Sequence, residues 1–289
     1  MMERVVIVGT GLIGASVGLA LRRAGFSGQI TGVDASPQEA DEAVGCGAVD
    51  TAVGVADGLS VCRDADLIVL AVPVLAIMDW LRKLAPVVGP HQLVTDVGST
   101  KASLCNLAAD GFNGPAQARF LPGHPMAGKE SGGAALADAS LFDGAMWLFT
   151  PIASETASTT EWRGWVSAFG CRTLDLDAAH HDRICAWVSH LPQMVATAMA
   201  AMFADEFAHA PELAEEFAAI GGRALREMTR LGASPYSMWR DVAMTNTEAV
   251  GATLFALEQR LAHIRENLKT PELRDEFAKA NAFRRELKS

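Results

Sequence analysis

Near its start the chain reads Val5-Val6-Ile7-Val8-Gly9-Thr10-Gly11-Leu12-Ile13-Gly14, and this stretch decides the fold. Its four β-branched residues predict a short strand buried in a parallel sheet. Three glycines follow at Gly-x-Gly-x-x-Gly spacing, and residues 15–24 then have helical character up to Gly25. A strand, a glycine-rich turn and a helix in this order predict the first unit of a dinucleotide-binding fold.

Each glycine has its own task in such a turn. Gly9 permits the tight turn, Gly11 lets the backbone approach a pyrophosphate, and Gly14 lets the helix pack closely on the strand. Leu12 and Ile13 belong to the first helical turn, whose free N–H groups and positive dipole end favour phosphates. These five residues are therefore predicted to bind the cofactor.

The choice of dinucleotide is predicted from Asp34, which ends the next strand twenty residues after Gly14. Its carboxylate suits the ribose hydroxyls and repels a 2′-phosphate, and residues 35–37 place no arginine beside it. NAD is therefore predicted as the cofactor. The strand that ends at Val72 and Pro73 reaches the same edge of the sheet and is expected to line the cofactor.

Strands alternate with helices up to about residue 176, whereas only helices are predicted after it. The further strands are expected at Gln29–Val33, Leu67–Val72, Leu93–Val97, Phe120–Leu121, Met146–Phe149 and Arg172–Leu176. The later helices are expected at 155–169, 178–208, 211–229, 235–268 and 271–287, with a kink or break at Pro192. The pattern predicts an α/β chain: a Rossmann-type doubly wound parallel sheet in an NAD-binding domain (1–176), then an all-α substrate-binding and dimerisation domain (177–289).

An apolar stripe marks the end of the helical region. Its members recur at a 3-4-3-4 spacing, and they are Leu254, Leu257, Leu261, Ile264 and Leu268. Such a stripe is typical of coiled-coil-like packing, either within the domain or between subunits. A homodimer is the predicted assembly.

Composition excludes several classes of partner. The 289 residues carry a formal net charge of -10, which argues against nucleic acid and anionic membranes. No apolar run is long enough to span a bilayer, and the N-terminus lacks the apolar region of a signal peptide. The five cysteines form no Cys-x-x-Cys pair and none is taken to cluster with histidine, so no metal site is predicted. A cytoplasmic protein with reduced, structural cysteines is expected.

Polar residues that can converge on a nicotinamide ring are found in four segments. These segments are 96–101 with Ser99, 123–132 with His124 and Glu130, 189–192 with His190, and 226–230 with Arg230, which Trp239 follows. A hydride that leaves an alcohol carbon requires a base at the hydroxyl, and histidine, with an unperturbed pKa of about 6.5, suits that task. His124, in a Gly-His-Pro turn just beyond a strand, is the predicted base.

Two of these candidates have a plain structural alternative. His190 either faces a substrate pocket or is a satisfied helix histidine. Arg230 suits a carboxylate because its guanidinium group is a planar fork, but it shares a helical face with Arg223 and Arg226, where cations favour a helix C-terminus. The remaining histidines are expected at the surface, and they are His91, His180, His181, His209 and His263.

Four motifs in this order resemble the prephenate and arogenate dehydrogenase family of tyrosine biosynthesis. They are Gly123-His124-Pro125-Met126-Ala127-Gly128, Thr150-Pro151, Ser189-His190-Leu191-Pro192 and Met228-Thr229-Arg230. The resemblance implies NAD-dependent oxidative decarboxylation of prephenate to 4-hydroxyphenylpyruvate, or of arogenate to tyrosine. It also implies a dicarboxylate substrate and roles for the candidate residues. His124 is then catalytic and Ser99 assists at the same hydroxyl, Arg230, His190 and Trp239 bind substrate, and Glu130 gates the site.

One departure from the family and two other classes of protein keep alternatives open. Many relatives carry Gly-Phe shortly before Thr-Arg, whereas this chain has Ala224-Leu225-Arg226-Glu227, so the choice between prephenate and arogenate stays open. A β-hydroxyacid dehydrogenase would need a lysine in the helical domain, and no lysine occurs between Lys129 and Lys269. An NAD-binding regulatory protein without turnover would not need His124, Ser99 and Arg230 together.

Overall fold

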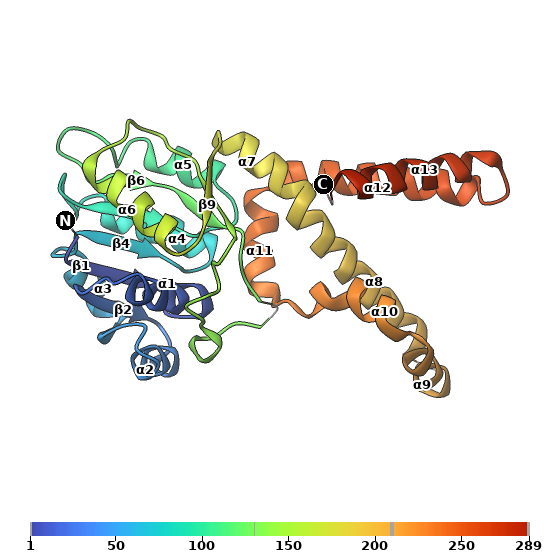
Figure 1. The fold of residues 1–289 in the computed structure, drawn as a ribbon, viewed down its shortest axis with the longest axis horizontal. Coiled ribbons are helices and arrows are strands. Elements are labelled where there is room, and N and C mark those ends of the chain that lie inside the picture. Colours follow the sequence, from blue (N-terminus) through green and yellow to red (C-terminus); the bar gives the residue numbers. More distant parts are fainter. Residues whose placement is uncertain (1, 130, 209–210, 288–289) are drawn as a thin grey trace.

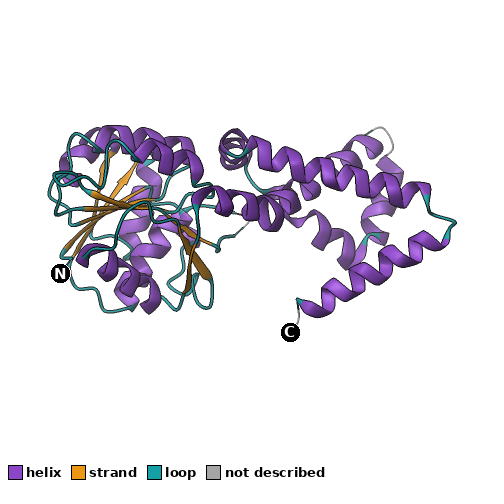
Figure 2. Cartoon of the chain, turned by 90° about the horizontal axis from the view of Figure 1, so that it is seen from above, coloured by secondary structure: helices purple, strands orange, loops and turns teal. Residues whose placement is uncertain are grey.

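The protein is described here by a computed structural model that covers residues 2–129, 131–208 and 211–287 (Figure 1). A layered α/β body forms one end of the molecule, and helices alone form the other end (Figure 2). The change occurs after the strand Arg172–Asp175, close to the predicted position near residue 176.

Six parallel strands form the main sheet, in the spatial order β3-β2-β1-β4-β5-β6. They are β1 (Arg4–Val8), β2 (Gln29–Asp34), β3 (Thr51–Gly54), β4 (Leu67–Leu70), β5 (Leu93–Asp96) and β6 (Arg119–Leu121). The order reverses between β1 and β4, and ligands of doubly wound sheets bind at such a switch point, beyond the carboxyl ends of the strands. The predicted fold class is confirmed.

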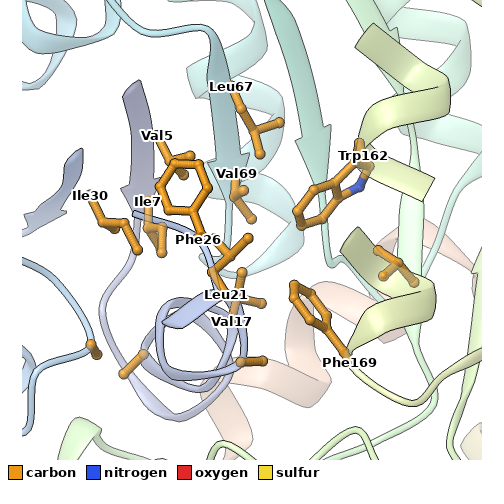
Figure 3. Packing of buried hydrophobic residues seen from close by; sticks show 14 of the residues in the cluster. Val5, Ile7, Val17, Leu21, Phe26, Ile30, Leu67, Val69, Trp162 and Phe169 are labelled. Carbon is orange, nitrogen blue, oxygen red and sulfur yellow. The ribbon is translucent and has the colours of Figure 1, made fainter. Parts of the chain in front are cut away.

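Helices cover both faces of this sheet. Those of the α/β body are α1 (Leu12–Arg23), α2 (Pro37–Gly45), α3 (Val55–Cys62), α4 (Val74–Leu84), α5 (Ala102–Ala108) and α6 (Ala157–Ala168). Side chains of a strand alternate between faces, so β1 supplies Val5 and Ile7 to one core and Val6 to the other. The first core includes α1 and α6, where Leu21 and Trp162 are buried (Figure 3).

A second, smaller sheet stands beside the first. It contains β7 (Gly123–Pro125), β8 (Met146–Phe149) and β9 (Arg172–Asp175), with β7 antiparallel to β8 and β8 parallel to β9. The prediction of a Gly-His-Pro turn was wrong, because His124 lies in β7 and pairs with Leu148. The reason is that Thr150 N–H bonds to Pro122 O (3.1 Å), which draws this segment onto β8.

The helical region contains more breaks than its sequence pattern predicts. Its α-helices are α7 (Ala178–Cys185), α8 (Leu191–Phe207), α9 (Pro211–Ile220), α10 (Gly222–Thr229), α11 (Tyr236–Thr245), α12 (Thr247–Glu266) and α13 (Pro271–Glu286). The break predicted at Pro192 is present as a π turn at Ala186–His190, which places the proline in the first turn of α8, where it removes no helical hydrogen bond. Two predicted helices are each split in two. The helix expected at 211–229 breaks at Gly222, which has φ +55°. The helix expected at 235–268 breaks at Asn246, which has φ −134° and ψ 34°.

Two helical arms extend from the body, one made by α8, α9 and α10 and the other by the hairpin of α12 and α13 (Figure 1). Of the predicted stripe, Leu254, Leu257 and Ile264 are half-buried, whereas Leu261 and Leu268 are exposed. Phe255 and Phe277 are also exposed on this hairpin, at 62% and 65%. Exposed apolar surface of this kind marks an interaction face, which is consistent with the predicted dimer. No helix in the described part of the chain is long and apolar enough to cross a membrane.

Candidate active site

The glycine-rich turn between β1 and α1 is shaped by close backbone contacts. A Cβ atom on Gly9, which has φ +90°, would lie 2.4 Å from Ala71 O and 2.7 Å from Val72 Cγ1. A Cβ atom on Gly14 would lie 1.9 Å from Gly9 O, whereas one on Gly11 would meet nothing within 4 Å. Packing therefore requires Gly9 and Gly14, and the backbone at Gly11 faces open space, as close approach of a pyrophosphate requires.

Asp34 is held beside this turn at the end of β2. Its Oδ2 accepts hydrogen bonds from Thr10 N (2.7 Å) and Thr10 Oγ1 (3.1 Å), and its Oδ1 accepts one from Ser36 N (2.8 Å). An ionised carboxylate offers about four lone-pair sites, so a site remains for a ribose hydroxyl. Leu12 and Ile13 open α1, Val72 packs on the turn and Pro73 precedes α4. These residues fit NAD.

A chain of side chains leads from His124 into the helical region. His124 Nδ1 lies 2.9 Å from Nε2 of His181, and His181 Nδ1 lies 2.8 Å from Oδ1 of Asp182. The same carboxylate accepts hydrogen bonds from the backbone N–H groups of Lys101 (2.7 Å) and Ala102 (2.9 Å). The expectation that His181 lies at the surface was wrong, because its side chain is fully buried against His124 of β7, while the neighbouring Asp182 bonds to the start of α5.

These contacts define where the protons lie. The Asp182 carboxylate only accepts, so His181 Nδ1 carries a proton and His181 Nε2 is an acceptor. His124 therefore donates through Nδ1–H, which leaves the lone pair on its Nε2. Burial lowers the pKa of His124 and that of His181, so both rings are neutral near pH 7. His124 thus has the form that a general base requires.

A buried ion pair fixes the strand that carries His124. Lys101 and Asp96 are both fully buried and in contact, and Lys101 Nζ also donates to Gly123 O (2.7 Å). Asp96 accepts hydrogen bonds from Gly98 N (2.8 Å) and Gly123 N (3.2 Å). Burial raises the pKa of Asp96, and Lys101 opposes this shift. The pair joins the end of β5 to β7, and sequence reasoning missed it because the segment that holds both members drew attention only for Ser99.

Ser99 lies half-buried in the loop that this ion pair closes. The described structure shows no hydrogen bond between Ser99 and His124. The next residue, Thr100, has its Oγ1 atom 2.7 Å from Thr245 Oγ1 at the end of α11. Asp241 of α11 accepts from Leu75 N (3.0 Å) at the start of α4. The helical region is thus bound to the edge of the sheet where ligands are expected.

His190 and Trp239 meet on the helical side of the site. His190 is fully buried in the π turn, and its ring lies edge-on to that of Trp239 with centroids 5.9 Å apart. Asn246 Nδ2 lies 3.3 Å from His190 Nδ1 and donates to Asp182 O (2.8 Å), which links His190 to the His124 chain. Burial lowers the pKa of His190 to about 4.

Two buried nitrogens there have no hydrogen-bond partner within the described part of the chain: His190 Nε2 and Trp239 Nε1. Buried polar groups are normally satisfied, so these two nitrogens are open to a hydrogen-bond partner from outside the described chain.

Arg230 opens a short 3-10 turn, Arg230–Ala233, that packs on α8, and its side chain is exposed. Gln193 Nε2 donates to Leu231 O (2.7 Å), so the turn is bound to the helix that follows His190. Glu130 lies outside the described residues, as does His209. The structure places the Arg230 segment on the His190 side of the site, against the helix that follows His190.

Cys185 completes a cluster that was not expected. Its Sγ atom lies 3.5 Å from His181 Nε2 and 3.9 Å from His124 Nδ1. The expectation that no cysteine clusters with histidine was wrong, because α7 places Cys185 one turn after His181 and β7 brings His124 to both. The spacing of four residues between His181 and Cys185 was the available signal.

Comparisons with known proteins agree with this geometry. The family models for the nucleotide-binding domain and the dimerization domain of prephenate dehydrogenase match residues 17–163 and 177–283. The prephenate dehydrogenase of Lactococcus lactis is 32% identical over 266 residues, which are 92% of this chain and 70% of that protein.

Two solved structures are similar over almost the whole chain. Prephenate dehydrogenase from A. aeolicus, in complex with hydroxyphenyl propionate and NAD+, has a TM-score of 0.83 at 28% identity and covers 100% of this chain and 96% of its own. Synechocystis arogenate dehydrogenase has a TM-score of 0.75 at 29% identity, and the match covers 98% of this chain and 99% of that one.

The dinucleotide turn and the buried, neutral histidine His124 are the features expected of a nicotinamide-dependent dehydrogenase. Within that class, the chain belongs to the prephenate and arogenate dehydrogenase family. The β-hydroxyacid dehydrogenase and the regulatory protein without turnover are therefore set aside.

Proposed function

We propose that this chain is an NAD-dependent prephenate dehydrogenase, which converts prephenate to 4-hydroxyphenylpyruvate and carbon dioxide. The observation that carries the proposal is the His124–His181–Asp182 chain, which holds a neutral histidine with a free Nε2 lone pair. The names of the relatives support the substrate, and arogenate is the second candidate because of the Synechocystis enzyme.

The chain's own residues supply proton transfer and binding. The turn from Gly9 to Gly14 and Asp34 would hold NAD, which would supply the acceptor for the hydride of the carbinol carbon. His124 Nε2 takes the hydroxyl proton, and loss of carbon dioxide then aromatises the ring. The positive charge formed on His124 is shared with His181 through their hydrogen bond, and the Asp182 carboxylate stabilises it there. Ser99 assists at the same hydroxyl.

The substrate is a dicarboxylate, and the binding roles follow from the residues on the helical side. Arg230 binds the ring carboxylate, His190 and Trp239 supply the two unpartnered nitrogens that face the substrate, and Glu130 gates the site. The assignment divides the chain into an NAD-binding domain (1–176) and a helical substrate-binding and dimerisation domain (177–289). The exposed apolar hairpin and the matched dimerization domain support a homodimer. The five cysteines, all free, support a cytoplasmic location.

The test is a comparison of initial rates on prephenate and arogenate, each with NAD and with NADP. We expect the highest kcat/KM with prephenate and NAD, because Asp34 repels a 2′-phosphate. A higher kcat/KM on arogenate than on prephenate would identify arogenate as the substrate. Equal rates with NADP and with NAD would contradict the role of Asp34. Absence of turnover on both substrates would overturn the proposal.

Replacing Arg230 with alanine should weaken substrate binding more than it slows the chemical step. The ring carboxylate is present in the bound substrate and departs as carbon dioxide, so its contact contributes mainly to binding. A charged hydrogen bond is worth about 1.5–3 kcal/mol, so KM should rise roughly ten- to a hundredfold with a smaller fall in kcat. Arg230→Lys should recover only part of the loss.

Arg226→Ala is the matched control, since Arg226 is also exposed and lies one helical turn earlier. Its effect on KM should be much smaller. A larger rise in KM for Arg226→Ala than for Arg230→Ala would show that Arg226, and not Arg230, binds the carboxylate.

A further inference from the structure

Three metal-ligating atoms meet behind the proposed catalytic base. These atoms are His124 Nδ1, His181 Nε2 and Cys185 Sγ, and all three residues are buried. The two nitrogens lie 2.9 Å apart, and the sulfur lies 3.5 Å from His181 Nε2 and 3.9 Å from His124 Nδ1. In a tetrahedral zinc site, Zn–N bonds of 2.0–2.1 Å and Zn–S bonds of 2.3 Å place ligand atoms about 3.3–3.6 Å apart. The three atoms therefore need to move by only a few tenths of an ångström to share one ion.

The surroundings of these atoms also suit a metal. His181 donates its other ring N–H to Asp182 Oδ1 (2.8 Å), the carboxylate contact that zinc-bound histidines usually make. His181 and Cys185 lie four residues apart on α7, so their side chains share one face of that helix. Because His181 Nδ1 carries the proton of that contact, its Nε2 keeps the lone pair that metal ligation by imidazole requires. Cys185 has no task in the proposed reaction.

We propose that His124, His181 and Cys185 form an inhibitory site for a thiophilic divalent cation such as Zn²⁺. A metal on His124 Nδ1 takes the place of the hydrogen bond to His181, and the ring proton of neutral His124 then moves to Nε2. That nitrogen loses its lone pair and no longer accepts the hydroxyl proton. The inhibitory consequence rests on the proposed function, whereas metal binding itself does not.

The ion reaches the cluster past His124, which keeps 7% of its surface exposed while Cys185 and His181 are fully buried. Binding converts the Cys185 thiol to a thiolate and releases that proton to solvent, since the metal binds only the thiolate. Burial raises the pKa of the Cys185 thiol to about 12.

Two measurements on the full-length protein test the site. Initial rates are recorded in the presence of NAD, substrate and increasing Zn²⁺, and then after addition of a chelator. Separately, the protein without substrate is titrated with Co²⁺ while thiolate-to-cobalt charge-transfer absorption is followed. The variants are Cys185→Ala and Cys185→Ser, with Cys62→Ala as the matched control. Cys62 is also fully buried with its pKa raised to about 12, but it lies in α3.

We expect Zn²⁺ to inhibit the wild type and Cys62→Ala reversibly, with one Co²⁺ bound per chain and a thiolate band. The Cys185 variants should keep the rate measured without metal and lose the thiolate band. They should need at least tenfold more Zn²⁺ for the same inhibition, because loss of even an outer-shell partner costs about 10–100-fold in metal affinity. Equal zinc sensitivity in the Cys185 variants, or a wild type without the band, would overturn the site. If the metal-free enzyme oxidises neither substrate, the proposed function fails, and the cobalt titration still decides the metal site.

Discussion

The His124→Asn variant is expected to bind NAD normally and to lose roughly two to four orders of magnitude in kcat. Asparagine can still donate a hydrogen bond to His181 Nε2, so the buried network should persist. The asparagine side chain has no basic nitrogen to take the hydroxyl proton, so water would have to accept that proton instead. His180→Asn is the control. His180 lies on α7 next to His181, but its ring contacts the exposed Arg183 side chain, with Nδ1 2.7 Å from Arg183 Nη2, and not His124.

The pH profile of the wild type gives an independent test of the same residue. His124 acts as a base in its neutral form, so activity is lost as pH falls through its pKa. Burial lowers that pKa below the ordinary value of about 6.5, so kcat/KM should hold until a more acidic pH than an exposed histidine would allow. A variant with near-normal kcat, or a wild-type profile whose acid limb lies above pH 6.5, would remove His124 from this role.

Replacing Lys101 with methionine is expected to lower the free energy of unfolding by about 3–5 kcal/mol, because it leaves the Asp96 carboxylate buried without its cation. Both side chains of the pair are fully buried. The double variant Asp96→Asn/Lys101→Met should regain much of this loss, since no uncompensated charge remains and the amide oxygen still accepts from a backbone N–H group. Denaturant unfolding followed by tryptophan fluorescence measures both changes.

Lys269→Met is the matched control, because Lys269 is exposed and should tolerate the same substitution with little change in stability. Removal of the pair should also loosen the link between β5 and β7, which carries His124. A Lys101→Met protein as stable as the wild type would show that the pair contributes nothing to folding. Equal stability of the single and double variants would show that the buried charge is not the cause.

Local sequence patterns were sufficient for the cofactor site. Gly9, Gly14 and Asp34 act within one strand-turn-helix unit and the strand that follows, so their spacing along the chain already contains their geometry. The same holds for the end of the sheet region near Asp175, where the change in residue pattern coincides with the last strand. The GHPMAG motif at 123–128 identified His124 for a similar reason, although its backbone forms a strand rather than a turn.

Long-range packing decided the rest of the site. His181 and His180 are neighbours with the same chemistry, and only the docking of α7 on α5 determines which ring is buried against His124. Asp182 and Asn246 acquired their partners in the same way, across contacts between segments 64 or more residues apart.

The chain by itself thus determined the dinucleotide fold and the cofactor and indicated His124 as the candidate base, because these depend on residues close in sequence. Tertiary structure decided the protonation of His124, since the proton on its Nδ1 is placed by His181 and Asp182 from the helical region. It also decided the ion pair of Asp96 and Lys101 and the cluster with Cys185. The physical reason is burial: removal from water makes these charges and lone pairs depend on the few partners that the fold brings within hydrogen-bond distance.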